Sequence, residues 1–221
     1  MGRAPLPSRR DVLIRAAGAL AGAGSVGAIM GGTGAQAAPS AATRPLDEAA
    51  AGALRQLPGK AILGASGVPS LVTELVDYNA ADWRRSALDM RELMAGDLGL
   101  AYTIVQAPRF DVRSLEAARV SLAVLASAPV QFEPFYLALA QGSGPVDGPA
   151  ALAAAGGIGL DRIVVFNGSI VPEVTASLTK AAAFAAMIGL FDTPAYVIGG
   201  TVYEGYLDLD RKRALIAAAR K

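Results

Sequence analysis

Residues 73–85 of the chain read TELVDYNAADWRR, which is the pattern of a strand that runs directly into a helix. The segment from Ser70 to Asp77 is apolar and β-branched, has the length of a strand and follows a Gly-Val-Pro breaker. Asn79 is a favoured N-cap residue, and apolar residues recur at helical spacing from Trp83 onward. The junction between the two elements is therefore expected between Asp77 and Trp83.

The remaining segments extend this junction into an α/β fold. A second strand is predicted at residues 100–105, so the two strands and the helix between them form a β-α-β unit with a right-handed crossover. The pattern is then helical, which predicts an all-helical insertion over about 114–190. Two short strands around Gly199-Gly200 predict a hairpin, and an Ala-rich helix over 209–221 ends the chain. The helices of the insertion are expected around 114–128, 132–141, 149–155 and 172–188.

Three separated blocks of the sequence carry a family resemblance. They are Asp77-Tyr78-Asn79 with its preceding strand, the segment 115–119 that reads LEAAR, and the segment 192–200 that reads DTPAYVIGG. Together they resemble the DsbA-like thioredoxin family, whose members are exported disulfide oxidoreductases. The resemblance implies a thioredoxin-like α/β fold with an inserted all-helical subdomain, the DsbA-like domain occupying residues 62–221. It also implies a cis peptide bond at Thr193-Pro194, facing the active-site helix.

The resemblance also shows what this chain lacks. In the family a C-x-x-C pair follows the D-Y-N segment, and the helix N-terminus favours the thiolate of the first cysteine. Here Ala80 and Trp83 stand at the two cysteine positions, and the chain contains no cysteine at all. Every thiol-disulfide reaction begins with a thiolate, so dithiol chemistry is excluded and no catalytic residue is assigned. The other family blocks are intact, which indicates a pseudoenzyme, a retained scaffold that has lost its chemistry.

Three features near these positions have more than one interpretation. Trp83 is either a core aromatic, which the gain from burying a large ring favours, or a groove residue that contacts a partner. Asp82 in the first helical turn is interpreted as a stabiliser of the helix N-terminus and not as a catalytic acid. The glycines of residues 156–159 resemble a phosphate loop, but no strand precedes them and no P-loop lysine follows, so a turn between helices is favoured.

The first 37 residues resemble a twin-arginine signal peptide. Ser8-Arg9-Arg10 precedes three apolar residues and an Ala/Gly-rich run, and Ala35-Gln36-Ala37 is a small-x-small cleavage site. An uncleaved anchor is the alternative, but a glycine-rich run makes a poor membrane helix. We therefore expect export to the periplasm, with only transient contact with the membrane. Residues 38–61 are expected to form a linker and one N-terminal helix.

Composition restricts the possible ligands. The formal net charge of the 221 residues is +1, and the signal peptide holds four arginines against one acidic residue, so the remainder is close to neutral. Such a body has no general electrostatic attraction for nucleic acid. The chain has neither histidine nor cysteine, which removes the usual ligands of zinc, copper, haem and iron–sulfur clusters as well as the Ser-His-Asp triad. No cofactor and no metal site are therefore expected.

The leading functional hypothesis is a non-catalytic, chaperone-like factor of the periplasm that binds an extended peptide or an envelope protein. The residues expected to form its binding groove are Tyr78, Asn79, Trp83, Thr193 and Pro194. An alternative is an enzyme of altered, non-dithiol chemistry that uses a bound thiol cofactor and a hydroxyl group near position 80. Tyr78 is the only hydroxyl-bearing residue close to that position. A third hypothesis, a structural subunit of an envelope complex, is not separable from the first by sequence.

Overall fold

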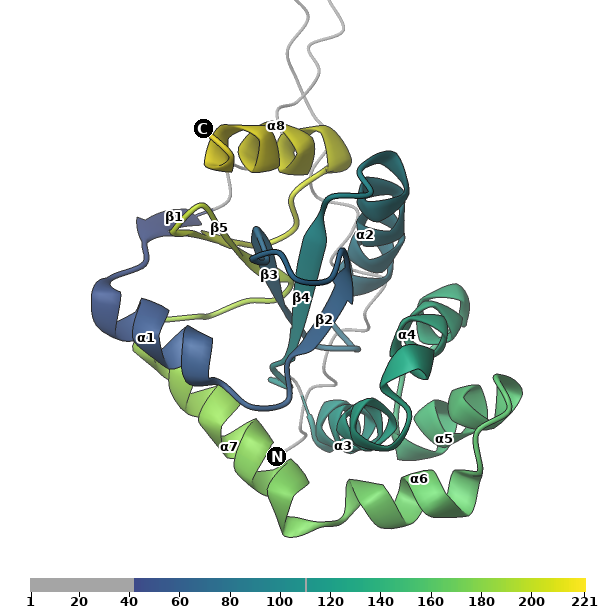
Figure 1. Cartoon of the computed structure of the whole chain (residues 1–221). Coiled ribbons are helices and arrows are strands. Elements are labelled where there is room, and N and C mark those ends of the chain that lie inside the picture. Colours follow the sequence, from purple (N-terminus) through teal and green to yellow (C-terminus); the bar gives the residue numbers. More distant parts are fainter. Residues whose placement is uncertain (1–41, 110) are drawn as a thin grey trace, which may run out of the picture. The chain divides into compact units, whose positions relative to one another are not determined.

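The computed structural model of the chain describes residues 42–109 and 111–221 (Figure 1). The predicted signal peptide, with Arg9 and Arg10, lies outside the described residues. All described residues fall within one unit, Pro39–Lys221.

A mixed six-stranded sheet lies at the centre of this unit. The strand order is β1-β6-β5-β3-β4-β2; β3 and β4 pair in parallel and every other neighbouring pair is antiparallel. Four of these strands match the sequence prediction, and β1 and β2 do not. The strands are β1 (Ala42–Pro45), β2 (Ala61–Gly64), β3 (Val72–Val76), β4 (Ala101–Gln106), β5 (Ala195–Ile198) and β6 (Thr201–Glu204).

The two unpredicted strands lie at the two edges of the sheet. Strand β1 and the first residue of β2 fall in the region 38–61 that the sequence assigned to a linker and one helix. Each has only four residues and forms its ladder with a single neighbour, β6 for β1 and β4 for β2. Strands this short carry too few residues for a period-2 pattern to stand out. Residues 42–61 therefore contain strand β1, one helix and the first residue of strand β2.

Helices cover both faces of the sheet, and a helical insertion separates β4 from β5 (Figure 1). Helices α1 and α7 pack on the face that presents Leu75, and α2 and α8 pack on the face that presents Val72 and Val76. The insertion extends from the start of α3 to the end of α7, as predicted. The helices are α1 (Glu48–Gln56), α2 (Trp83–Gly96), α3 (Val112–Ser127), the 3₁₀ turn η1 (Pro129–Gln131), α4 (Phe132–Gln141), α5 (Gly148–Gly157), α6 (Arg162–Ser169), α7 (Pro172–Met187) and α8 (Leu209–Ala219).

Aspartate N-caps explain where most of these helices begin. The side chains of five aspartates accept hydrogen bonds from backbone N–H groups of the first turn, at the starts of α1, α3, α5, α6 and α8. Helix α2 differs, because its N-cap residue Asp82 makes no such bond. The sequence prediction that Asn79 caps this helix is therefore wrong, and the side chain of Asn79 is used elsewhere.

Candidate functional site

The candidate site lies where β3 ends, and it begins with a buried carboxylate. Asp77 Oδ1 accepts hydrogen bonds from Ser114 Oγ at 2.6 Å and from the Asn79 backbone N–H at 2.8 Å. Its Oδ2 accepts one from the Arg109 backbone N–H at 2.6 Å. These bonds join the end of β3 to the first turn of α3 and to the loop that precedes it. Asp77 is thus a structural anchor for the helical insertion.

The next two residues fasten the insertion at other points. Tyr78 shares a 2.7 Å hydrogen bond with the hydroxyl of Ser121 in the middle of α3. Asn79 Nδ2 donates to the Val146 carbonyl at 2.9 Å, and its Oδ1 accepts from the Val146 N–H at 2.8 Å, in the segment before α5. We call Asp77, Tyr78 and Asn79 with these partners the insertion clamp. The clamp gives the D-Y-N segment a structural role that needs no cysteine.

The two positions that hold cysteines in the resembling family are buried here. Ala80 is 3% exposed and Trp83 is 0% exposed. The Trp83 ring meets the Tyr78 ring edge-on, with centroids 5.0 Å apart, and lies 5.9 Å from the Tyr136 ring. Of the two interpretations of Trp83, the structure supports the core aromatic. The indole lies in the interior between Tyr78 of the clamp and Tyr136 of α4.

The structure brings the Thr193-Pro194 segment to the same end of the sheet. Ala195 of β5 pairs with Leu75 of β3, so the two residues before Ala195 come next to the junction after Val76. The peptide bond between Thr193 and Pro194 is cis. Thr193 is buried, and its Oγ1 has no hydrogen-bond partner among the described residues.

Most of the side chains that were expected to line the binding groove are buried. The side chains of Tyr78, Trp83, Thr193 and Pro194 are all buried, and only Asn79 is half-buried. These five side chains therefore do not line a surface groove together, although they are close to one another at one end of the sheet. The exposed surface at this end is formed by the segment before Thr193, in which Phe191 is 85% exposed.

Two residues that the sequence analysis did not single out hold this exposed segment. Arg44 of β1 donates to the Ile188 carbonyl at 2.5 Å, to the Gly189 carbonyl at 3.0 Å and to Glu204 Oε2 at 3.0 Å. Glu204 of β6 in turn accepts hydrogen bonds from the backbone N–H groups of Phe191 and Asp192. No sequence signal indicated this loop anchor, because its contacts span up to 160 positions.

The charge of Glu204 depends on this loop anchor. Partial burial would raise the pKa of Glu204, but the hydrogen bonds from Arg44 and from the two backbone N–H groups outweigh it. The net result is a pKa below the usual value for a glutamate. The carboxylate form is therefore the one that holds the segment before Thr193-Pro194.

Another ionisable group, the carboxyl of Glu74, is fully buried in the core next to the junction between β3 and α2. Glu74 of β3 is 0% exposed and accepts hydrogen bonds from Ser86 Oγ at 2.5 Å and Tyr102 Oη at 2.7 Å. Lys212 of α8, equally buried, donates to Ser86 Oγ at 3.0 Å and to Asp89 at 3.0 Å. Burial raises the pKa of Glu74, and the positive charge of Lys212 offsets part of that rise.

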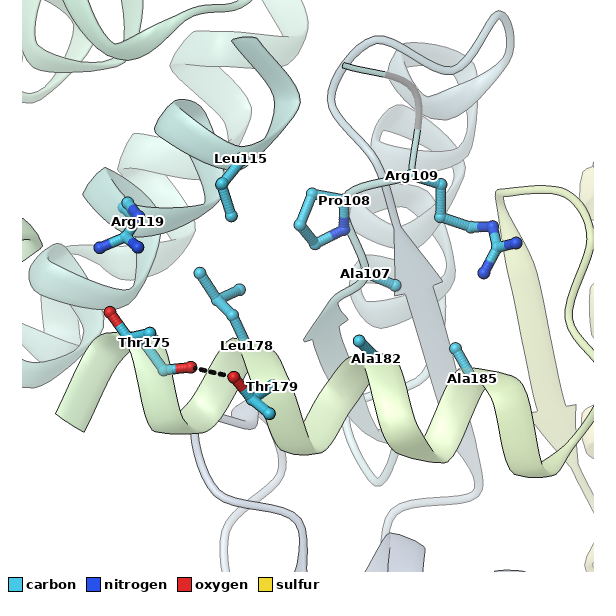
Figure 2. A pocket seen from close by; sticks show the side chains of 10 residues that line it. All are labelled: Ala107, Pro108, Arg109, Leu115, Arg119, Thr175, Leu178, Thr179, Ala182 and Ala185. Atoms are coloured by element: carbon cyan, nitrogen blue, oxygen red, sulfur yellow. Dashed lines mark hydrogen bonds between the residues drawn. The ribbon is translucent and has the colours of Figure 1, made fainter. Parts of the chain in front are cut away.

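A cavity of about 300 Å³ opens between α3, α7 and the loop after β4 (Figure 2). It is adjacent to the insertion clamp, because Arg109 in its wall also donates its backbone N–H to Asp77. The residues that line it are Ala107, Pro108, Arg109, Leu115, Arg119, Thr175, Leu178, Thr179, Ala182 and Ala185. We refer to this cavity as the α3–α7 groove.

Within residues 42–109 and 111–221, no group of three or more acidic side chains is placed to hold a metal ion. None of the helices in the described part of the chain is long and apolar enough to cross a membrane.

Comparisons with known proteins agree on the fold. No protein-family model and no curated protein matches the sequence, but solved structures do. A thioredoxin-like oxidoreductase from Silicibacter pomeroyi DSS-3 is 27% identical, with a TM-score of 0.70 over 76% of this chain and 96% of that chain. A periplasmic thioredoxin-like protein from Salmonella enterica serovar Typhimurium is 19% identical, with a TM-score of 0.70 over 80% of this chain and 98% of that chain. The thiol-disulfide exchange protein α-DsbA2 from Wolbachia pipientis is 18% identical, with a TM-score of 0.68 over 77% and 95%.

The predicted fold class is therefore confirmed. The chain has the DsbA-like thioredoxin fold with a helical insertion, and it differs from thiol-disulfide exchange proteins in having no cysteine.

Proposed function

We propose that this protein is an exported, non-catalytic binding factor that holds an extended segment of another protein beside the Thr193-Pro194 loop. The observation that carries the proposal is the replacement of the cysteine positions by buried, well-packed residues in an otherwise complete scaffold. Ala80 and Trp83 are part of the core, while the loop before Thr193 is held by Arg44 and Glu204. The fold around positions 80 and 83 and the loop before Thr193 are thus retained although the cysteines are missing.

The exposed apolar side chains near the loop support this proposal. Phe191 is 85% exposed, Met187 at the end of α7 is 57% exposed and Val112 at the start of α3 is 66% exposed. Large apolar side chains exposed close together mark protein-binding surfaces more often than chance. The α3–α7 groove lies between the helices that carry Met187 and Val112, so an extended segment would have apolar surface to contact on leaving the loop.

The periplasm is the proposed location, reached by the twin-arginine route. The leader with Arg9 and Arg10 supports this assignment, as does the description of one structural neighbour as periplasmic. Export of an already folded chain is compatible with a protein that has no disulfide to form.

The alternative of an enzyme with altered chemistry has less support. Its candidate hydroxyl, Tyr78, is 1% exposed and hydrogen-bonded to Ser121 inside the insertion clamp. Burial raises the pKa of the Tyr78 phenol well above its ordinary value, so the phenolate is disfavoured there. Ala80 offers no functional group and is itself buried. The residues around position 80 therefore do not provide a nucleophile or a base facing solvent.

The proposal is tested by measuring how well the purified mature protein binds fluorescently labelled extended peptides and delays aggregation of an unfolded client. Phe191→Ser should weaken both effects, because it removes an exposed apolar contact beside the loop. Leu98→Ser is the matched control, since Leu98 is 87% exposed but precedes β4 at the opposite end of the sheet. Equal losses in both variants, or no binding by the unmodified protein, would contradict the proposal.

A further inference from the structure

The α3–α7 groove is lined mainly by apolar side chains and carries positive charge. Six of its lining residues are Ala107, Pro108, Leu115, Leu178, Ala182 and Ala185, which are apolar. Two threonines add hydroxyl groups, and the Thr179 hydroxyl is already bonded to the Thr175 carbonyl at 2.9 Å. Among the described residues that line the groove, only Arg109 and Arg119 are charged, and none of them is acidic.

Among the residues that the structure describes, neither of these arginines has a partner for its guanidinium group. No hydrogen bond, ion pair or ring contact joins the guanidinium of Arg109 or Arg119 to another residue of the described ranges. By contrast, Arg113, which follows Arg109 closely in sequence, is paired with Asp111 at 2.5 Å. Arg119 is also half-buried against apolar side chains, where an unpaired cation gains more from an anionic partner than it would in water.

The two cations lie toward opposite ends of the groove. In Figure 2, Arg119 is drawn at the Thr175 end of α7 and Arg109 at the Ala185 end, with Leu115, Pro108 and Leu178 between them. Ten residues of helix separate Thr175 from Ala185, a rise of about 15 Å. An extended chain covers about 13 Å between residues i and i+4, so its end side chains would match this spacing.

We infer that the α3–α7 groove binds an extended peptide segment in which acidic side chains about four residues apart flank apolar ones. This inference rests on the proposed function and adds the chemistry of the bound segment. Carboxylates of the segment pair with the guanidinium groups of Arg109 and Arg119, which form bidentate hydrogen bonds with carboxylates. The apolar residues between them cover Leu115 and Leu178. A ligand with one carboxylate and an apolar tail would leave its tail against the second cation, which disfavours it.

The test uses the mature protein and three labelled, end-blocked peptides: Glu-Ala-Leu-Ala-Glu, the same peptide with Gln for Glu, and the same peptide with Lys for Glu. Fluorescence anisotropy at low salt should show the acidic peptide binding about tenfold more tightly than the Gln peptide, and the Lys peptide most weakly. Added salt should reduce this preference, because the groove is open to solvent at its ends. Decanoate, as a single carboxylate with an apolar tail, should compete poorly.

Substitutions of Arg119 test whether the preference for the acidic peptide arises in the α3–α7 groove. Arg119→Gln should remove most of the preference for the acidic peptide, and Arg119→Lys should restore part of it, since it keeps the charge and loses the bidentate geometry. Arg91→Gln is the matched control, because Arg91 is exposed on α2 and makes no bond to another described residue. The guanidinium group of Arg119 has no partner to lose among the described residues, so the thermal unfolding midpoint of the Arg119 variants should stay that of the unmodified protein.

The outcomes separate this inference from the proposed function. Equal affinity for the acidic and Gln peptides, or an acidic preference that survives both Arg119→Gln and Arg109→Gln, would overturn the inference. If the Gln peptide still binds and Phe191→Ser weakens it, the proposed function stands without the inference. Tight, competitive binding of decanoate would replace the peptide with a small amphiphile. No binding of any peptide would overturn both.

Discussion

Single residues decide what chemistry this scaffold can support. Glu74 and Trp83 both lie at 0% exposure near the junction, one ionisable and one aromatic. Glu74 is stabilised in its charged form only by Ser86, Tyr102 and the nearby Lys212, against the cost of burial. Trp83 fills volume that a cysteine side chain would leave empty. Substitution of either residue should therefore change the stability of the fold in a measurable way.

The buried carboxyl of Glu74 should make stability depend on pH. Its pKa is raised in the folded protein, so the native state binds this proton more tightly than the unfolded chain, in which a Glu pKa is about 4.3. The resulting stabilisation is complete below about pH 4.3 and is lost as the pH rises through the folded-state pKa. Glu74→Gln removes this titration. The free energy of unfolding of Glu74→Gln relative to the unmodified protein should therefore increase with pH across that window, as measured by urea unfolding. A difference that is constant with pH would contradict the assignment.

Restoring a cysteine at position 83 should be costly. Trp83→Cys leaves a cavity between the Tyr78 and Tyr136 rings, and truncating a buried Trp costs about 3–5 kcal/mol of unfolding free energy. Trp83→Phe, which keeps an aromatic ring, should cost clearly less in the same urea titration. The double variant Ala80→Cys with Trp83→Cys should gain thiol chemistry only in a destabilised protein. A Trp83→Cys variant as stable as Trp83→Phe would show that the indole packing contributes little.

Among the secondary-structure elements, the helical insertion is fixed to the sheet by the insertion clamp. Its polar contacts run from three consecutive residues, Asp77, Tyr78 and Asn79, to α3 and to the segment before α5. The loop anchor of Arg44 and Glu204 does the same for the connection from α7 to β5. Both sets of contacts position the candidate site.

The clamp predicts a local loss of protection when Asn79 is changed. Asn79→Ala removes both hydrogen bonds to Val146 and leaves a buried N–H and C=O unsatisfied, at a cost of about 1–3 kcal/mol. Hydrogen exchange should accelerate around Val146 and α5 more than in β3. Asn167→Ala is the matched control, because Asn167 is exposed on α6 and should change neither quantity. Uniform acceleration throughout the chain would instead indicate a general loss of stability.

The loop anchor predicts a pH effect of the opposite sign to that of Glu74. The pKa of Glu204 is lowered in the folded protein, so its stabilisation is present above the unfolded value of about 4.3 and is lost as the pH falls through the folded-state pKa. The protection factors of the Phe191 and Asp192 amides, which compare each exchange rate with its intrinsic rate at the same pH, should then fall at low pH. Glu204→Gln should show the lower protection already at neutral pH. Protection of these two amides that is the same in Glu204→Gln and the unmodified protein would refute the anchor.

For the whole molecule, the proposed export rests on the arginine pair of the leader. Arg9→Lys combined with Arg10→Lys should leave the precursor in the cytoplasm, because the twin-arginine route reads the arginine pair. Cell fractionation with an antibody against the mature chain measures this. Unchanged export of the double variant would remove the twin-arginine assignment and leave the binding proposal in place.

Much of the element order was predictable because it follows from local patterns. The strands β3 and β4, the hairpin of β5 and β6, and helices α3, α4, α5, α7 and α8 all carry enough apolar periodicity or turn residues to be recognised. Helix α6 was missed for a physical reason. Only Val165 and Ser169 are buried in it, while Ile163, Val164 and Phe166 are exposed, so its apolar residues mark no single buried face.

The sequence predicted where in the fold the candidate site lies, but not which of its side chains are exposed to solvent. The register of β3 with β5 does bring Thr193-Pro194 to the end of the strand that leads to Asp77, in line with the three family-like blocks. Which side chains face solvent there depends on packing between distant elements. Tyr78 was expected in the groove and Trp83 in either the core or the groove; both are in the core, because α3 and α4 supply Ser121 and Tyr136 to cover them.

Two properties of this protein follow from its sequence alone. The absence of any thiolate follows from composition, and the order of most strands and helices follows from local periodicity. The remaining features depend on how the elements pack. The clamp, the loop anchor and the α3–α7 groove each join residues that are distant in sequence, such as Asn79 with Val146, or Arg44 with Glu204. Such contacts form because folding brings separate elements together, and no local pattern in the chain encodes them.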